Sequence, residues 1–402
     1  MSGVYFLVMT VRREMFNLLR EYAYLAPAKA VHLPTHIPFT EINRCLLDLI
    51  LLNSHFQKYP PSKQYQRSFW KVIIAELENS LSELQDEDEE IDHRVLDHYL
   101  SILPSSGPVS GSSKADLLDH ICDRGLPKAE APSKSFVTHF WKHSSDDVFQ
   151  SEQVNLTEYQ MSTLEESRTT IENGQTGLRT WFASHLLARY LIQNRDIVEG
   201  KRVLELGSGI GFLGIIASSL QQLASEGGAI WLTDVNNEVL SQCQRNVQLP
   251  CNLSSTHQFI HYRSLDWVEA LQPDVGPLEA LLQDEIDPDI VLGADIVRFT
   301  FHCCRYHRFL QVFDPTLVLP LIALITLALQ PGCSHKTQKF AIIALTVRNT
   351  ETFQLFLDCA QEKGLILQNI TLTTELDFID PVEVGASAAN IKAFKIILDQ
   401  NA

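Results

Sequence analysis

The sequence predicts an α/β protein whose open, largely parallel sheet follows a helical N-terminal region. Three observations indicate this fold class. A short apolar run at residues 203–206 breaks at a glycine-rich turn, residues 207–211, and continues into an apolar stretch of helical length. Similar short apolar runs recur towards the C-terminus, separated by segments with helical spacing. No helical segment separates the last two runs, so they are expected to form an antiparallel hairpin that closes the sheet.

The N-terminal residues 1–103 have the periodicity of helices. Apolar side chains recur at helical spacing over residues 41–58, and the same spacing resumes from Phe69 after a Pro-Pro break. A further short helix is expected over residues 91–103. This region contains no motif of recognisable chemistry.

Residues 104–150 are interpreted as a linker or irregular segment. They begin with PSSGPVSGSS, in which proline, glycine and serine predominate. A second domain is therefore expected over residues 151–402. It opens with strand-like alternation from Gln153, followed by a helix over residues 182–193 that would lie across the sheet.

The elements that follow alternate between strand and helix. Strands are expected at residues 203–206, 229–233, 262–265, 289–295, 339–347, 365–373 and 391–398, with helices at 212–220, 238–247, 320–329 and 350–363. Such alternation is typical of βαβ units, in which neighbouring strands run parallel.

The composition argues against some classes of function. The 402 residues include 49 acidic and 32 basic side chains, which gives a net charge of −17, whereas binding nucleic acid requires clustered Lys and Arg. An acidic chain is better suited to docking on a basic protein surface. The eight cysteines form no C-x-x-C pair and are expected to be reduced thiols.

No membrane-directing segment is expected. Residues 6–11 are too short for a secretory hydrophobic region, and Asp and Pro interrupt the most apolar stretch, residues 312–329. We therefore expect a soluble, cytoplasmic monomer that has no membrane, nucleic-acid or metal partner.

The glycine-rich turn indicates the kind of ligand. A dinucleotide fingerprint, G-x-G-x-x-G, would require glycine at the position of Phe212. The chain instead has the pattern E-x-G-x-G-x-G, which begins at Glu205 and includes Gly207, Ser208 and Gly209. A turn of this kind brings backbone N–H groups close to a nucleotide, but this spacing does not match the dinucleotide pattern.

Acidic and aromatic residues follow the expected strands at the edge where ligands of open α/β sheets bind. Asp234 ends the second strand, where a carboxylate can accept hydrogen bonds from ribose hydroxyls; the alternative is an N-cap for the next helix. Asp266 and Trp267 end the third strand, and the indole suits an adenine ring, with core packing as the alternative. Ala294 and Asp295 end the fourth strand.

These landmarks together resemble the class I S-adenosylmethionine-dependent methyltransferases, which have a Rossmann-like seven-stranded sheet. The segments TGLRTW, VLELGSGIG, LDW, GADI and LTVRNTETFQLF are similar to the protein-lysine methyltransferases of methyltransferase family 16, in the branch that methylates eukaryotic elongation factor 2. The last segment, residues 345–356, is the most discriminating because it lies outside the cofactor motifs. The resemblance covers about residues 153–402, and the helical region more weakly.

The resemblance implies a protein-lysine N-methyltransferase whose cofactor is S-adenosylmethionine and whose protein partner is elongation factor 2. In that family the cofactor has no phosphates, so the glycines serve close backbone approach. The residues that would surround the cofactor are Trp181, Glu205, Gly207, Ser208, Gly209, Asp234, Asp266, Trp267 and Ala294. Asp234 would hold the ribose. Asp295 would be the catalytic residue that orients the target amine, with an N-cap or a core ion pair as its alternative.

Two alternatives to this function remain open. The same scaffold can methylate another protein or a small molecule, although no N-P-P-Y type tetrapeptide follows the fourth strand to indicate an amide or a nucleobase. The chain can also be an inactive module that binds cofactor and uses its helical region to hold a partner.

Residues 297–311 interrupt the family pattern beside Asp295. Removing them gives ADI-VFDPTL, which restores the usual aromatic position at Phe313. The segment begins with Val and ends with Gln, whose codons can supply the GT and AG limits of an intron, so we hypothesise a retained intron in the gene model. A zinc site in this segment is disfavoured because its two cysteines are adjacent. A genuine insertion here would put the activity of this chain in doubt.

Overall fold

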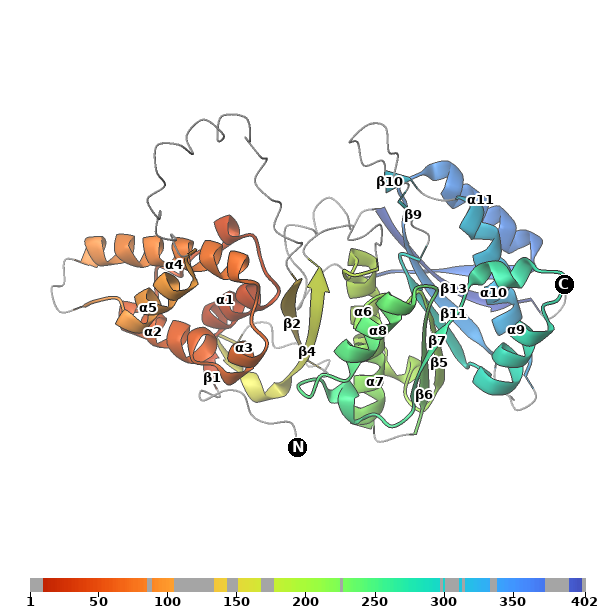
Figure 1. Ribbon diagram of the computed structural model, residues 1–402, viewed down its shortest axis with the longest axis horizontal. Helices are drawn as coiled ribbons and strands as arrows, with labels where there is room; N and C mark the ends of the chain where they lie inside the picture. The colour runs from red at the N-terminus through yellow and green to blue at the C-terminus, as the bar shows by residue number, and fades with distance from the viewer. Residues whose placement is uncertain are drawn as a thin grey trace, which may run out of the picture.

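The chain folds into a helical N-terminal unit and an α/β unit, with a pair of long strands between them (Figure 1). The computed structural model describes residues 10–84, 89–104, 134–142, 151–167, 177–224, 227–296, 315–332, 338–372 and 390–399, and the backbone of 299–300 and 311–312.

The α/β unit is built on a seven-stranded sheet with the order β12-β13-β11-β8-β5-β6-β7. Its strands are β5 (Arg202–Leu206), β6 (Ala229–Asp234), β7 (Ile260–Ser264), β8 (Ile290–Ala294), β11 (Phe340–Thr346), β12 (Leu365–Ile370) and β13 (Ile391–Leu398). β13 runs antiparallel to both of its neighbours, β11 and β12, and the other pairings in this sheet are parallel. The predicted Rossmann-like sheet with a closing antiparallel hairpin is therefore confirmed.

Helices cover both faces of this sheet (Figure 1). One face carries α6 (Phe182–Gln193), α7 (Phe212–Ala224) and α8 (Asn237–Val247), and the other carries α9 (Gly276–Ala280), α10 (Val318–Ala328) and α11 (Thr350–Glu362). Side chains on both faces of the sheet are therefore buried. In β5, Val203 packs in one helix-covered core and the next residue, Leu204, packs in the other, and both are fully buried. Burial on both faces explains why the strands read as continuous apolar runs.

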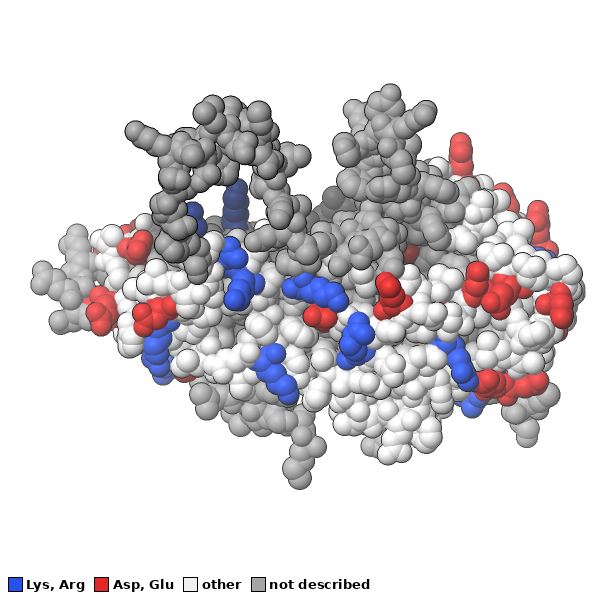
Figure 2. Space-filling view, in the orientation of Figure 1, with Lys and Arg blue, Asp and Glu red and all other residues white. Residues whose placement is uncertain are grey.

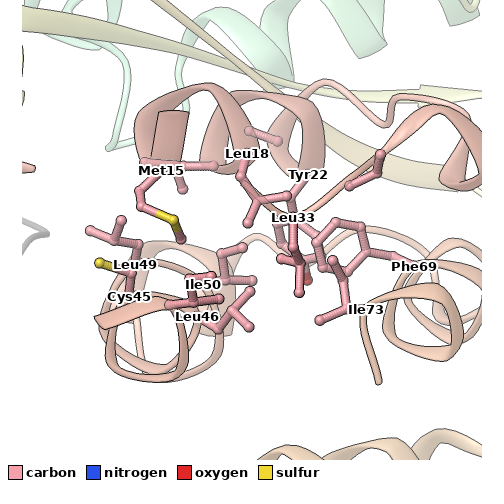
Figure 3. Packing of buried hydrophobic residues seen from close by; sticks show 14 of the residues in the cluster. Met15, Leu18, Tyr22, Leu33, Cys45, Leu46, Leu49, Ile50, Phe69 and Ile73 are labelled. Carbon is pink, nitrogen blue, oxygen red and sulfur yellow. The ribbon is translucent and has the colours of Figure 1, made fainter. Parts of the chain in front are cut away.

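The N-terminal unit has its own hydrophobic core. Its elements are β1 (Thr10–Arg12), α1 (Arg13–Ala23), α2 (Phe39–Cys45), a π-helical turn (Leu46–Leu51), α3 (Ser54–Lys58), α4 (Lys63–Leu84) and α5 (His93–Ile102). Figure 3 shows side chains of α1, such as Met15 and Tyr22, directed towards those of the following helices. The helical character predicted for this region is present, but β1 differs from it. This strand pairs with β3 (Gln153–Asn155), beyond the predicted domain boundary.

The strands between the two units form an antiparallel ribbon, in which β2 (Lys134–Lys142) pairs with β4 (Tyr159–Ser167). The interpretation of residues 104–150 as linker or irregular is therefore wrong for residues 134–142. Neighbouring side chains of β2 lie in different cores, with Phe140 in the N-terminal core and Trp141 in the core against α6 and α7. Because both faces are buried, the sequence lacks the alternation that would have revealed the strand.

The retained-intron hypothesis concerns residues that lie outside the described part of the chain. Within residues 297–311 and the residue that follows, the structure describes only the backbone pairing of β9 (Phe299–Thr300) with β10 (Gln311–Val312). The hypothesis stays a prediction. Among the helices that the structure describes, none has the length and apolar character needed to cross a membrane.

Two leucines of α10 provide a test of the core. Leu321 is fully buried, whereas Leu319 on the same helix is 42% exposed. We expect Leu321→Ala to lower the free energy of unfolding by about 2–5 kcal/mol, because it removes buried apolar contacts and leaves a cavity. Leu319→Ala should change it by no more than about 0.5 kcal/mol. Urea unfolding of both variants measures the difference, and equal effects would contradict the burial described for α10.

Candidate active site

A cavity of about 430 Å³ opens where β5, β6, β7 and β8 end. Its walls include all ten residues predicted to bind cofactor or act in catalysis: Trp181, Glu205, Gly207, Ser208, Gly209, Asp234, Asp266, Trp267, Ala294 and Asp295. The carboxyl edge of an open α/β sheet is where ligands of this fold class bind, and the volume lies in the range of small-molecule sites. The structure therefore brings the predicted residues together in one place.

The glycine turn has a backbone that only glycine adopts readily. Gly207, Gly209 and Gly211 have φ values of +62°, +52° and +93°. A Cβ atom on Gly211 would lie 2.8 Å from Sγ of Cys243 on α8, so the turn packs directly on that helix. Ser208 ties the turn to β6, since its N–H donates to the Thr233 carbonyl (2.8 Å) and its Oγ accepts from the Thr233 N–H (3.0 Å).

Glu205 places a buried carboxyl group beneath the turn. Its side chain is 4% exposed, and among the described residues none donates a hydrogen bond to Oε2. Burial raises the pKa of this carboxyl from its ordinary value of 4.5 to about 8, because the low-dielectric surroundings disfavour the charged form. A buried acceptor without a partner in a cavity wall is suited to a cationic donor on a ligand.

Asp234 anchors the other side of the turn. Its Oδ2 accepts from the Gly209 N–H (3.3 Å) and its Oδ1 accepts from the Asn236 N–H (2.9 Å). Burial raises the pKa of this carboxyl. Helix α8 is capped by Asn236, whose Oδ1 accepts from the N–H groups of Glu238 and Val239. The alternative that Asp234 is the N-cap is therefore wrong.

Aromatic side chains contribute to two parts of the wall. Trp267 is half-buried and packs against the core under α10, yet its Cζ2 atom would lie 3.4 Å from a Cβ on Gly207. The indole thus belongs both to the core and to the cavity, as the two sequence interpretations proposed. Asp266 is exposed and caps the short helix Trp267–Leu271 through the Val268 N–H (3.0 Å). Trp181 directly precedes α6.

Asp295 has an unusual backbone at the end of β8. Its φ is +52°, a left-handed conformation that is rare outside glycine. Its N–H donates to the Ala344 carbonyl and its Oδ1 accepts from the Thr346 N–H, both at 2.9 Å, so β11 orients the carboxylate. Within the described residues Asp295 forms no ion pair, in contrast to one of its alternative roles. Held strain of this kind is common at functional sites.

The charge of the cavity indicates its ligand. Among the residues that the structure describes, four carboxyl groups line it, those of Glu205, Asp234, Asp266 and Asp295, together with the guanidinium of Arg179. Such a wall repels phosphates and suits a ligand with positive centres and one carboxylate. Among the described residues no group of three or more His, Cys, Asp or Glu could hold a metal ion.

Sequence reasoning missed lining residues just before α6. Arg179 and Thr180 line the cavity, and Thr180 Oγ1 donates to Oε1 of Glu166 on β4. Both lie inside the TGLRTW segment, which was the available signal. The hydrogen bond of Thr180 depends on β4, whose position next to this segment could not be inferred from the sequence.

The geometry agrees with a comparison against known protein families. Residues 160–304 match the family described as lysine methyltransferase. The chain therefore contains a segment similar to this family, and that segment includes the glycine turn and Asp295. Its relatives include protein-lysine N-methyltransferase EFM3 of Chaetomium thermophilum, 32% identical over 205 residues that make up 50% of this chain and 52% of the relative. Human protein-lysine N-methyltransferase EEF2KMT is 30% identical over 203 residues, 48% of this chain and 52% of that protein.

A third relative aligns over more of the chain. An uncharacterised protein of Dictyostelium discoideum is 24% identical over 346 residues, 81% of this chain and 77% of that protein. The chain spans about half the length of the EFM3 and EEF2KMT relatives in these alignments.

S-adenosylmethionine is the cofactor of this lysine methyltransferase family, and the cavity fits it. The cofactor carries a sulfonium and an ammonium group, which are complementary to the four carboxyl groups of the wall. Glu205 Oε2, which has no hydrogen-bond partner among the described residues, can accept a hydrogen bond from a cationic donor, and Gly207 and Gly209 of the turn line the cavity.

The pKa of Glu205 predicts a pH dependence of stability in the absence of cofactor. The unfolded chain loses this proton near pH 4.5, whereas the folded chain keeps it to about pH 8. The resulting stabilisation is fully present below pH 4.5 and is lost as the pH rises through 8. Relative to Glu205→Gln, the wild-type free energy of unfolding should fall by at most about 1.4 kcal/mol per pH unit across this window. Urea unfolding at several pH values tests this, and parallel profiles would contradict it.

Proposed function

We propose that the protein transfers a methyl group from S-adenosylmethionine to the ε-amino group of a lysine in eukaryotic elongation factor 2. The observation that carries the proposal is the geometry of Asp295, which lines a cavity suited to this cofactor. Its backbone is strained, and the Thr346 N–H orients its carboxylate. The match of residues 160–304 to the lysine methyltransferase family supports the reaction.

We expect different residues of the cavity to contact different parts of the cofactor. In the proposal Asp234 accepts hydrogen bonds from the ribose, Trp267 lies against the adenine, and Glu205 accepts a hydrogen bond from the ammonium group. The backbone of the glycine turn provides the floor, and Trp181 lies at the opposite wall. When bound, the cofactor supplies a methyl group that is already activated on sulfur, so the protein's main contribution is alignment.

The target lysine must lose a proton before it can attack. A free lysine has a pKa of about 10.4, so it enters the site as an ammonium group. Asp295 accepts a hydrogen bond from that group and holds the nitrogen in line. A carboxylate also stabilises the charged amine, so we assign Asp295 an orienting role and assign proton acceptance to water.

The choice of elongation factor 2 rests on the segment at residues 345–356. This segment ends β11 and begins α11, and Asn349 caps that helix through the N–H groups of Glu351 and Thr352. Thr346 holds the Asp295 carboxylate, so the segment lies on the side of the cavity where the substrate amine is expected. Figure 2 shows acidic side chains over the end of the molecule that carries α9 to α11, which suits a basic substrate segment.

A cytoplasmic monomer is part of the proposal. The four cysteines that the structure describes, Cys45, Cys243, Cys251 and Cys359, are free thiols, as expected in a reducing compartment. Basic side chains near the middle of the face in Figure 2 are mixed with acidic ones. Lys134 forms an ion pair with Glu165, with Nζ and Oε2 3.7 Å apart. This mixture supports a protein substrate over nucleic acid.

A methyl-transfer assay tests the substrate. Labelled S-adenosylmethionine and purified elongation factor 2 are incubated with the full chain and with a variant that lacks residues 297–311. We expect the shortened chain to label the factor at a lysine. Transfer by the shortened chain alone would support the retained-intron hypothesis, and transfer by both would identify a tolerated insertion. If both chains bind cofactor and neither labels the factor, the substrate assignment is wrong.

Substitution of Asp295 tests the orienting role. Asn tolerates the left-handed backbone, so Asp295→Asn should preserve the fold while removing the charge. We expect kcat to fall about 100-fold or more, because the amine is no longer held in line, while the cofactor Kd changes less than about threefold. The control is Asp358→Asn on the exposed face of α11, which should retain wild-type activity. An unchanged kcat in Asp295→Asn would refute the role.

A further inference from the structure

A buried amide joins the glycine turn to the ribbon. Asn246 lies on α8 and is 1% exposed. Its Nδ2 donates to the carbonyls of Ile210 (3.0 Å) and Glu165 (3.3 Å). Its Oδ1 accepts from the Glu165 N–H (2.9 Å) and from Nε2 of Gln242 (3.2 Å). Both donors and both acceptor positions of the amide are therefore used.

The two segments that this amide joins are far apart in the chain. Ile210 lies in the glycine turn and lines the cofactor cavity, whereas Glu165 belongs to β4. The Asn246 amide pairs with the backbone of Glu165 much as a neighbouring strand would, and its remaining N–H fixes a carbonyl of the turn. A fully satisfied buried network of this kind is rigid.

The same strand also holds the opposite wall of the cavity. The Ser167 N–H donates to the Leu178 carbonyl at 2.9 Å, and Glu166 accepts from Thr180. Strand β4 therefore contacts both the segment before α6 and, through Asn246, the glycine turn. A displacement of β4 relative to α8 would change the width of the cavity between these walls.

We propose that Asn246 is a positioning residue for cofactor binding. Its amide makes the position of the glycine turn depend on the position of the ribbon formed by β2 and β4. The inference rests on the proposed use of this cavity for S-adenosylmethionine. Through this amide, packing of the N-terminal unit on β2 and β4 acts on the cofactor site without touching the ligand.

Asn252 offers a matched control. It is 2% exposed, its Nδ2 donates to the Thr163 carbonyl (2.8 Å), and its Oδ1 accepts from the Thr163 N–H (2.7 Å). It thus pairs with β4 in the same manner, two residues from Glu165, and its other N–H contacts the Asn246 carbonyl on α8. Asn252 does not line the cavity.

The experiment compares Asn246→Ala with Asn252→Ala. Binding of S-adenosylmethionine is measured by calorimetry, at a temperature where melting curves show each variant to be folded. We expect both substitutions to lower the melting temperature, since each removes buried hydrogen bonds. Asn246→Ala should raise the Kd about tenfold or more, whereas Asn252→Ala should raise it less than about threefold. Should Asn246→Ala not fold, Asn246→Asp keeps the size and both acceptors and removes the two donors.

The outcomes separate this inference from the proposed function. Wild-type affinity in the Asn246 variants, or equal weakening by Asn252→Ala, would refute the positioning role alone. A wild-type chain that binds cofactor but methylates nothing would refute the proposed reaction and leave the positioning role standing. A wild-type chain that does not bind S-adenosylmethionine would refute both.

Discussion

Close packing between the glycine turn and α8 is the contact on which the rest of the site depends. The turn can lie this near the helix because Gly211 has no side chain to meet Cys243. The Ser208 N–H, which donates to the Thr233 carbonyl, and the Gly209 N–H, which donates to the Asp234 carboxylate, then fix the position of the turn relative to β6. The main chain of the turn therefore forms a rigid floor of the cavity, and the lining side chains surround this floor.

Electrostatics gives that rigid floor its selectivity. Carboxyl groups at the ends of successive strands disfavour phosphates and favour cations, and burial raises the pKa of the Glu205 carboxyl to about 8. Asp295 differs because a neighbouring strand, rather than burial, determines the direction of its carboxylate. One cavity thus contains acids with different tasks, distinguished by their surroundings.

The parts of the fold that could be predicted depend on local patterns. Strands buried on both faces read as apolar runs, and the acidic residues that follow them could be placed at one edge from topology alone. The sequence could not show that Asn236, and not Asp234, caps α8, because this depends on the residue at which the helix begins. Strand β2, Thr180 and Asn246 were missed for one physical reason: each of them contacts β4, and contacts between distant segments leave no periodic pattern in the sequence.

The ribbon has a consequence for how the molecule comes apart. Phe140 and Trp141 are adjacent, yet they complete different hydrophobic cores, and β4 faces both cores as well. If the ribbon separated from one unit, apolar side chains that pack in the core of the other unit would also be exposed. We therefore expect unfolding of one unit to destabilise the other, and a fragment that begins at residue 151 would lack β2, the strand that pairs with β4.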